Sequence, residues 1–130
     1  YGTSHIYSSL KSAVIQFTKS VGLELAESGI RVNSVSPGAI VTGIFGKTKD
    51  DNSETADKNS DSLKSVFSQA QPIKRAGKPE DIANVVAFLA SDESTFVTSS
   101  DYLVDGGMIA GRQFSVTLER MKILSEMANK

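Results

Sequence analysis

A long helical pattern followed at once by a strand pattern is the feature that most constrains the fold of this chain. From residue 4 to residue 28, apolar side chains recur at steps of three and four, with Thr3 or Ser4 available as N-cap and Gly29 as C-cap. Residues 30–38, IRVNSVSPG, then give a β-type run that closes on proline and glycine. A helix, a short turn and a buried strand are typical of an α/β sheet.

The rest of the chain alternates helical and strand-like segments in the same way. Residues 63–70 predict a short amphipathic helix, and another begins near Pro79, where acidic neighbours complement the positive helix end. The buried stripe of this second helix is expected to contain Ile82, Val85, Val86 and Leu89. Residues 102–104 predict a short strand, and residues 115–128 carry apolar side chains at helical spacing. Two strands joined through helices do not make a stable parallel sheet. We therefore expect an α/β domain that is incomplete in this chain.

Composition argues against several classes of function. The 130 residues are 39% hydrophobic and 22% charged, which suits one globular core. A net charge of −1 offers no basic surface for nucleic acid or an anionic membrane. There is no cysteine and only one histidine, so we expect no metal site and a reducing, cytoplasmic location. The longest apolar run, residues 85–90, is far shorter than the ~20 residues that a membrane-spanning helix needs.

Tyr7 and Lys11 are one turn apart at the start of the first predicted helix. Side chains at i and i+4 share a helix face, with Cβ atoms about 5–6 Å apart. A phenol ionises only near pH ~10, and a nearby cation favours its anion, so the pair could form a proton-transfer centre. The spacing alone is weak evidence, because three tyrosines and ten lysines give roughly 0.2 such pairs by chance. The alternative is a half-buried tyrosine beside a solvated lysine.

Five motifs in order resemble the C-terminal half of classical short-chain dehydrogenases/reductases. They are YSSLK at 7–11, IRVNSVSPG at 30–38, AIVTGIFG at 39–46, RAGKPEDIANVVAFLAS at 75–91 and YLVDGG at 102–107. The resemblance covers about residues 1–107. It implies a Rossmann-type fold, in which a doubly wound parallel sheet lies between two layers of helices to give three layers, α/β/α. Residues 1–130 would form the C-terminal portion of this single NAD(P)-binding domain.

The resemblance implies an NAD(P)-dependent oxidoreductase that interconverts an alcohol and a ketone or aldehyde by hydride transfer. Tyr7 would give a proton to the carbonyl oxygen or remove one from the alcohol, and it would also belong to the cofactor-binding residues. Lys11 would favour the phenolate of Tyr7 and hold the ribose hydroxyls of the cofactor, which is NAD or NADP. His5, two residues before Tyr7, is expected to be a partly exposed residue at the helix start and not a catalytic group.

The turn at Pro37 and Gly38 is the candidate cofactor loop. Glycine allows close approach of the backbone, and the loop beyond a strand's carboxyl end is where α/β sheets bind nucleotides. By resemblance, Ile40 would contact the nicotinamide carboxamide through its backbone, and Thr42 would use its hydroxyl there or toward a phosphate. On base rates, such a turn is more often only a turn. Asn33 is expected to fix its strand to neighbouring segments and not to touch substrate.

Residues 43–76 are expected to form a substrate lid. Between residues 47 and 62 nearly every side chain is polar, which predicts a mobile loop. The lid's apolar residues could form one wall of a pocket for a hydrophobic alcohol or ketone, or could equally be ordinary core. These candidate substrate-binding residues are Ile44, Phe45, Val66 and Phe67.

Three parts of the family pattern would lie upstream of Tyr1: the glycine-rich phosphate loop, the residue that separates NAD from NADP, and the active-site serine. The chain alone is therefore expected to be inactive. Ser99 stands where related sequences commonly carry glycine, so we expect a different backbone conformation in that turn. Asp105 and the two glycines after it are expected to be structural and to end the last strand.

Two other functions remain open at this point. The chain could be a non-catalytic remnant that serves as an oligomerisation or binding piece, or the same fold could catalyse epimerisation or dehydration. For the complete protein the resemblance implies a homo-tetramer or homo-dimer, with the helices that begin at Ser4 and Pro79 packing against partner copies.

Overall fold

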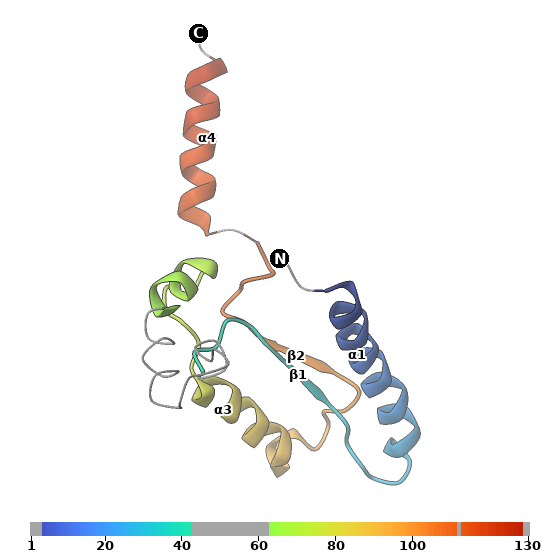
Figure 1. Ribbon diagram of the computed structural model, residues 1–130. Helices are drawn as coiled ribbons and strands as arrows, with labels where there is room; N and C mark the ends of the chain where they lie inside the picture. Colours follow the sequence, from blue (N-terminus) through green and yellow to red (C-terminus); the bar gives the residue numbers. More distant parts are fainter. Residues whose placement is uncertain (1–3, 43–62, 112, 129–130) are drawn as a thin grey trace. The chain divides into compact units, whose positions relative to one another are not determined.

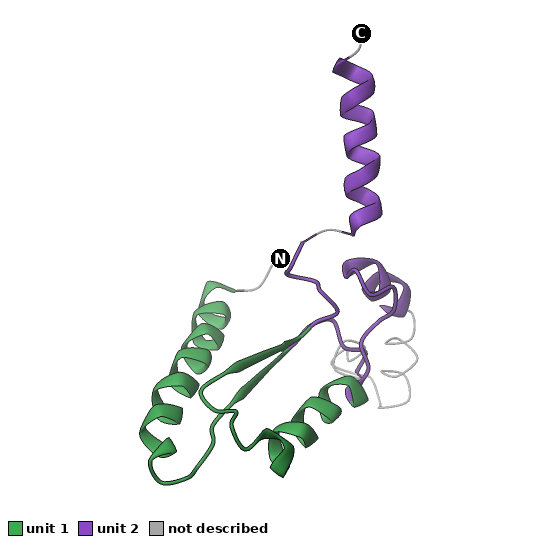
Figure 2. Cartoon of the chain, turned by 180° about the vertical axis from the view of Figure 1, so that it is seen from behind, with its two compact units in different colours: residues 1–36, 80–104 green, residues 37–79, 105–130 purple. Residues whose placement is uncertain are grey.

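The computed structural model describes residues 4–42, 63–111 and 113–128. These residues belong to two compact units, one made of residues 1–36 and 80–104 and the other of residues 37–79 and 105–130 (Figure 2). None of the helices in the described ranges combines the length and the hydropathy that crossing a membrane requires.

The first unit is a layered α/β arrangement. Strands β1 (Ser34–Pro37) and β2 (Asp101–Val104) pair in parallel, and in both views they lie between helices α1 (His5–Ala26) and α3 (Pro79–Ala90) (Figures 1 and 2). Helix α3 lies in the connection between the two strands, as a parallel pair requires. The α/β class predicted from the sequence is confirmed.

Helix α1 begins at its predicted N-cap, although the Ser4 side chain makes no capping hydrogen bond, and it ends two residues earlier than predicted, at Ala26 with Glu27 as C-cap. Ser4 is the N-cap, and its carbonyl accepts the N–H of Ser8 at 3.1 Å. Gly29 follows the helix with φ 74°, and its N–H donates to Ala26 O at 2.9 Å. A left-handed glycine after the last turn is a common helix stop. The buried residues of α1 are Thr18 and Gly22, so its small side chains face the rest of the unit.

Helix α3 also starts at the predicted proline, but its stripe is less buried than expected. Ile82, Val85 and Leu89 are half-buried, whereas Val86 is 49% exposed. None of these four side chains is fully buried, so the prediction of a buried stripe was wrong, most clearly at Val86. Val86 still lines a shallow hollow with Val35 of β1, which places this helix against the sheet.

Strand β1 starts later than the apolar pattern predicts, because residues 32 and 33 bond to the segment before β2. The N–H of Val32 donates to Thr98 Oγ1 at 3.1 Å. Asn33 donates through Nδ2 to Val97 O at 2.9 Å and accepts the N–H of Ser100 at 3.2 Å. The prediction that Asn33 fixes its strand to its neighbours is confirmed.

Ser99, in the turn before β2, corrects an expectation. Its φ is 59°, in the left-handed region that favours glycine. The expectation of a different backbone conformation is therefore wrong, because Ser99 keeps the left-handed φ that glycine would adopt. The N–H of Ser99 donates to Val32 O at 2.7 Å, which holds the conformation in place.

The second unit contains a helix over residues 63–70, helix α4 (Phe114–Ala128) and the turn that follows β2. In that turn the carboxylate of Asp105 accepts the N–H groups of Gly107 at 2.8 Å and Ile109 at 2.9 Å. Asp105 is buried, and both following glycines have positive φ. The predicted role of this turn in ending the strand is confirmed.

Candidate functional site

Helix α1 places Tyr7 and Lys11 on one face within its first two turns. The amine of Lys11 lies 5.5 Å from the centroid of the Tyr7 ring, within the range of a cation–π contact. Tyr7 is 55% exposed and Lys11 is exposed. Both groups can therefore be reached by a bound molecule, and the ammonium stands beside the phenol as the spacing predicts. His5, the first residue of the helix, is exposed as expected.

The candidate cofactor loop begins where β1 ends at Pro37. A Cβ added to Gly38 would lie 2.5 Å from the Cα of Asp105, so no side chain fits at this position. The close approach that the glycine permits is therefore an approach to the turn after β2. This packing requirement explains the glycine without any ligand.

Ile40 lies in a short parallel bridge with Gly77. The N–H of Val41 donates to Gly77 O at 2.9 Å, and the N–H of Gly77 donates to Ala39 O at 3.0 Å. In this pattern the N–H and C=O of Ile40 point to the other side of the bridge. Thr42, two residues on, is half-buried.

The candidate substrate residues are only partly described. Ile44 and Phe45 lie outside the described residues. Val66 is 59% exposed and Phe67 is half-buried, both on the helix over residues 63–70. A hollow of about 350 Å³ borders this helix, but neither of the two residues lines it. Its lining residues are Val41, Lys64, Ser65, Ser68, Arg75, Ala76, Gly77 and Lys78.

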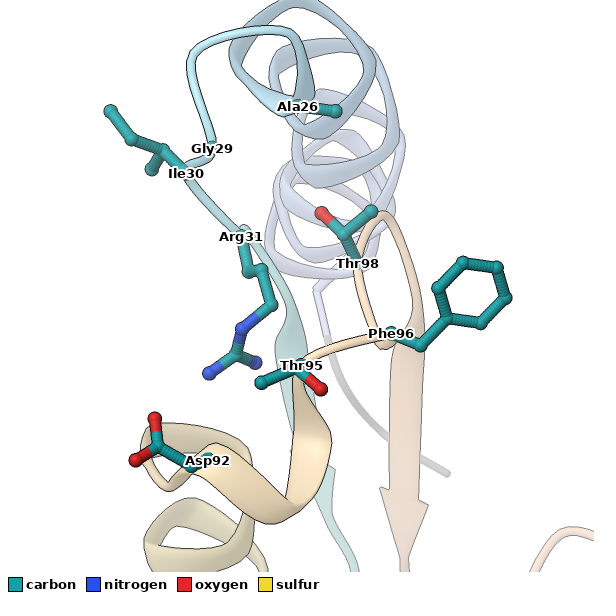
Figure 3. Close-up of a pocket in the computed structure, with 8 residues that line it drawn as sticks. All are labelled: Ala26, Gly29, Ile30, Arg31, Asp92, Thr95, Phe96 and Thr98. Atoms are coloured by element: carbon teal, nitrogen blue, oxygen red, sulfur yellow. The ribbon is translucent and has the colours of Figure 1, made fainter.

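A larger hollow of about 680 Å³ lies at the other end of α1, near the amino ends of the strands (Figure 3). Arg31 faces into it, and Phe96 points away from the other lining side chains (Figure 3). The guanidinium already donates to Ser94 Oγ at 2.9 Å and to Ser91 O at 3.2 Å. Nucleotides bind α/β sheets beyond the carboxyl ends of the strands, so this hollow is not the expected cofactor site.

Sequence reasoning missed the structural role of Arg31. Its guanidinium connects the start of the β1 segment to the turn after α3, where a 3₁₀ helix, η2 (Asp92–Ser94), was not predicted. The available signal was a charged residue at the start of an apolar run, which indicates a partner for the charge. The sequence does not show which residues are the partners, because they lie some sixty residues further along the chain. Among the described residues, no group of three or more His, Asp or Glu side chains could hold a metal ion.

Comparison with known proteins identifies the family. The model of the enoyl-(acyl carrier protein) reductase family matches residues 1–109. A 3-alpha-(or 20-beta)-hydroxysteroid dehydrogenase of Mycobacterium bovis is 39% identical over 107 residues, which are 82% of this chain and 35% of the relative. The chain belongs to the short-chain dehydrogenase/reductase family, as its motifs predicted.

Solved structures agree with this assignment. L-sorbose reductase from Gluconobacter frateurii, in complex with NADPH and L-sorbose, matches with a TM-score of 0.69 and 35% identity over 85% of this chain and 43% of that one. 4-Hydroxyisoleucine dehydrogenase, in complex with NADH and succinate, matches with a TM-score of 0.64 and 33% identity over 81% and 38%. The chain thus spans about two fifths or less of these relatives and corresponds to a C-terminal part of the Rossmann-type fold.

Proposed function

We propose that the whole protein containing this chain is an NAD(P)-dependent oxidoreductase that interconverts a small alcohol and its ketone or aldehyde. The observation that carries the proposal is the Tyr7–Lys11 pair, exposed on one helix face with the amine 5.5 Å from the ring. Family membership supports it, because the relatives named above are dehydrogenases and reductases. The proposed cofactor is NAD or NADP, since one solved relative carries NADH and the other NADPH.

In this proposal Tyr7 moves the proton. During reduction its hydroxyl donates to the carbonyl oxygen of the substrate, and during oxidation the phenolate accepts the proton of the alcohol. Lys11 places its ammonium beside the ring, 5.5 Å from the ring centroid. Its ammonium has three donors, so it can also bind the hydroxyls of a ribose. The nicotinamide, when bound, supplies or accepts the hydride.

The loop from Pro37 to Thr42 is proposed to hold the cofactor. The N–H and C=O of Ile40 point away from Gly77, so they are oriented for a ligand contact and not used by that bridge. An amide such as the nicotinamide carboxamide offers both a donor and an acceptor to such a backbone. Thr42 would add its hydroxyl, and Gly38 would keep the loop close to Asp105.

A wall of apolar residues is proposed for the substrate, with Val66 and Phe67 as its described members and Ile44 and Phe45 as the others. The exposed surface of Val66 supports this placement, because the free energy falls when a hydrophobic substrate covers an apolar side chain that was in contact with water. We therefore favour an apolar alcohol or ketone.

Self-association and location complete the proposal. Ile6, Leu10 and Phe17 of α1 are 72%, 63% and 67% exposed, and such apolar surface suits a homo-dimer or homo-tetramer. The absence of cysteine in these 130 residues suits the reducing cytoplasm. Sedimentation of the whole protein would test the assembly.

The activity is tested by Tyr7→Phe in the whole protein, with Tyr102→Phe on β2 as a control that also loses one phenolic hydroxyl. We expect kcat/KM to fall about 10²- to 10⁴-fold in the first variant, because general acid-base catalysis is lost, and to stay within about twofold in the second. NAD(P)H affinity, measured by fluorescence titration, should persist in both. Undiminished turnover in Tyr7→Phe would remove Tyr7 from the mechanism. Conversion of substrate without stoichiometric consumption of cofactor would favour epimerisation or dehydration.

A further inference from the structure

The turn that follows the helix over residues 63–70 is tied to the C-terminal segment of the chain. The N–H of Ile73 donates to Gly106 O at 3.1 Å. Nε2 of Gln113 donates to the backbone carbonyl of Gln71 at 3.1 Å. A Cβ on Gly106 would lie 3.2 Å from Gln71 Cγ, so the backbone itself packs on the glutamine side chain. The two segments are therefore joined by hydrogen bonds and by close packing.

Gln71 is the buried centre of this junction, with 3% of its surface exposed. Its Nε2 donates to Arg75 O at 2.5 Å, which closes the turn. Its Oε1 is buried and has no hydrogen-bond partner among the described residues. A buried acceptor without a partner carries a desolvation penalty. The hydrogen bonds that Gln71 does make, through Nε2 and through its backbone carbonyl, offset part of that penalty.

Gln113 connects the junction to helix α4. Its carbonyl accepts the N–H groups of Val116 at 3.0 Å and Thr117 at 3.3 Å, so its backbone forms the first turn of that helix. Its side chain reaches back to Gln71. Gln113 lies beyond residue 109, where the family match ends. The family pattern therefore does not supply this contact.

We propose that Gln113 is a positioning residue for substrate binding. Its side chain holds the turn at Gln71 by the hydrogen bond from Gln113 Nε2 to the Gln71 carbonyl, a contact that we call the latch. This turn fixes the end of the helix that carries Val66 and Phe67. The C-terminal helix α4 thereby sets where the apolar substrate wall stands. The latch rests on the contacts above, whereas its effect on substrate rests on the proposed oxidoreductase function.

Three variants of the whole protein test the latch. Gln113→Met keeps the length of the side chain and the backbone carbonyl that starts α4, but it removes the N–H donor. Gln113→Lys keeps a donor of similar reach. Ser115→Ala, exposed in the first turn of the same helix, is the matched control. Amide hydrogen exchange of residues 63–73 and steady-state kinetics are measured for each.

We expect exchange at residues 63–73 to become about two- to tenfold faster in Gln113→Met, the range for one hydrogen bond, and to return toward the original rate in Gln113→Lys. KM for substrate should rise by a similar factor, with kcat and NAD(P)H affinity within about twofold. Unchanged exchange in Gln113→Met, or equal changes in Ser115→Ala, would overturn the latch. Faster exchange with an unchanged KM would overturn its role in substrate binding. If the unmodified protein oxidises or reduces nothing, the proposed function fails, while the exchange data still decide the latch.

Discussion

Gly22 of helix α1 lies directly against Ser99, the residue that turns the chain toward strand β2. A Cβ on Gly22 would overlap Ser99 Oγ and would lie 3.1 Å from both Cα and N of Ser99. Ser99 is the only residue other than glycine with a positive φ in the part of the chain that the structure describes. Its Oγ is buried without a hydrogen-bond partner in those ranges. The contact therefore combines backbone strain with an unsatisfied hydroxyl.

Ser99→Gly is expected to stabilise the protein. Glycine adopts φ near +60° without the cost of about 1 kcal/mol that a side chain adds, and it removes the buried hydroxyl. We expect the free energy of unfolding in urea to rise by about 1–2 kcal/mol. Ser100→Gly is the control, because Ser100 has no positive φ and should lose about 0.5–1 kcal/mol. A loss of stability in Ser99→Gly would contradict the strain assigned to this turn.

Gly22→Ala should destabilise the protein although alanine is the better helix former. The added methyl group has no space beside Ser99, and such overpacking costs about 1–3 kcal/mol, more than the gain of about 1 kcal/mol in helix propensity. Urea unfolding measures the difference, with the exposed Ser12→Ala as the control on the same helix. Adding Ser99→Gly should restore part of the loss, because Ser99 Oγ is then absent. Additive effects of the two changes would argue against direct contact.

Gly38→Ala should be more damaging than Gly22→Ala. The methyl group would meet the Cα and Cβ of Asp105 at 2.5 and 2.6 Å, and a backbone cannot rotate aside as a hydroxyl can. We expect a loss of about 3 kcal/mol, at the upper end for overpacking, measured by thermal or urea unfolding. Ala39→Gly, one position later, is the control for added flexibility. Full stability in Gly38→Ala would show that the β1 and β2 ends lie further apart.

Arg31→Lys tests a contact that was not visible in the sequence. The guanidinium donates to Ser94 Oγ, Ser91 O and Val97 O, and a lysine ammonium cannot reproduce this planar fork. We expect a loss of about 1.5–3 kcal/mol in unfolding free energy, since hydrogen bonds from charged groups contribute that much. Amide exchange of residues 91–98 should become faster. Unchanged amide exchange of residues 91–98 in Arg31→Lys would mean that the hydrogen bonds of Arg31 do not stabilise this segment.

The sequence predicts features that arise from neighbours along the chain. Helices α1, α3 and α4 follow from periodicity and from capping residues such as Ser4, and the i, i+4 spacing places Lys11 beside Tyr7 before any fold is known. These relations depend on local helical geometry. They agree with the structure because each relation joins residues only a few positions apart in the sequence.

Long-range contacts left no comparable signal. Gly38 was interpreted as a place for a ligand to approach, yet the structure puts Asp105 there, and that pairing depends on the two strands lying together. The contact of Gln113 with Gln71 joins segments 42 residues apart, with no periodicity to reveal it. Burial of Val86 was expected from its spacing alone, whereas the exposure of a helix position is decided by what packs on it.

Lys11→Met separates the chemistry of the Tyr7 pair from the stability of helix α1. Lys11 is exposed, so its loss should change the unfolding free energy by less than about 0.5 kcal/mol. The proposed mechanism nevertheless needs its charge beside the phenol and its donors at the ribose. We therefore expect kcat/KM to fall at least about 10²-fold and NAD(P)H affinity to weaken. Lys19→Met, at an exposed lysine on the same helix, should change neither quantity. Equal turnover in the Lys11 and Lys19 variants would mean that the amine near the Tyr7 ring takes no part in the reaction.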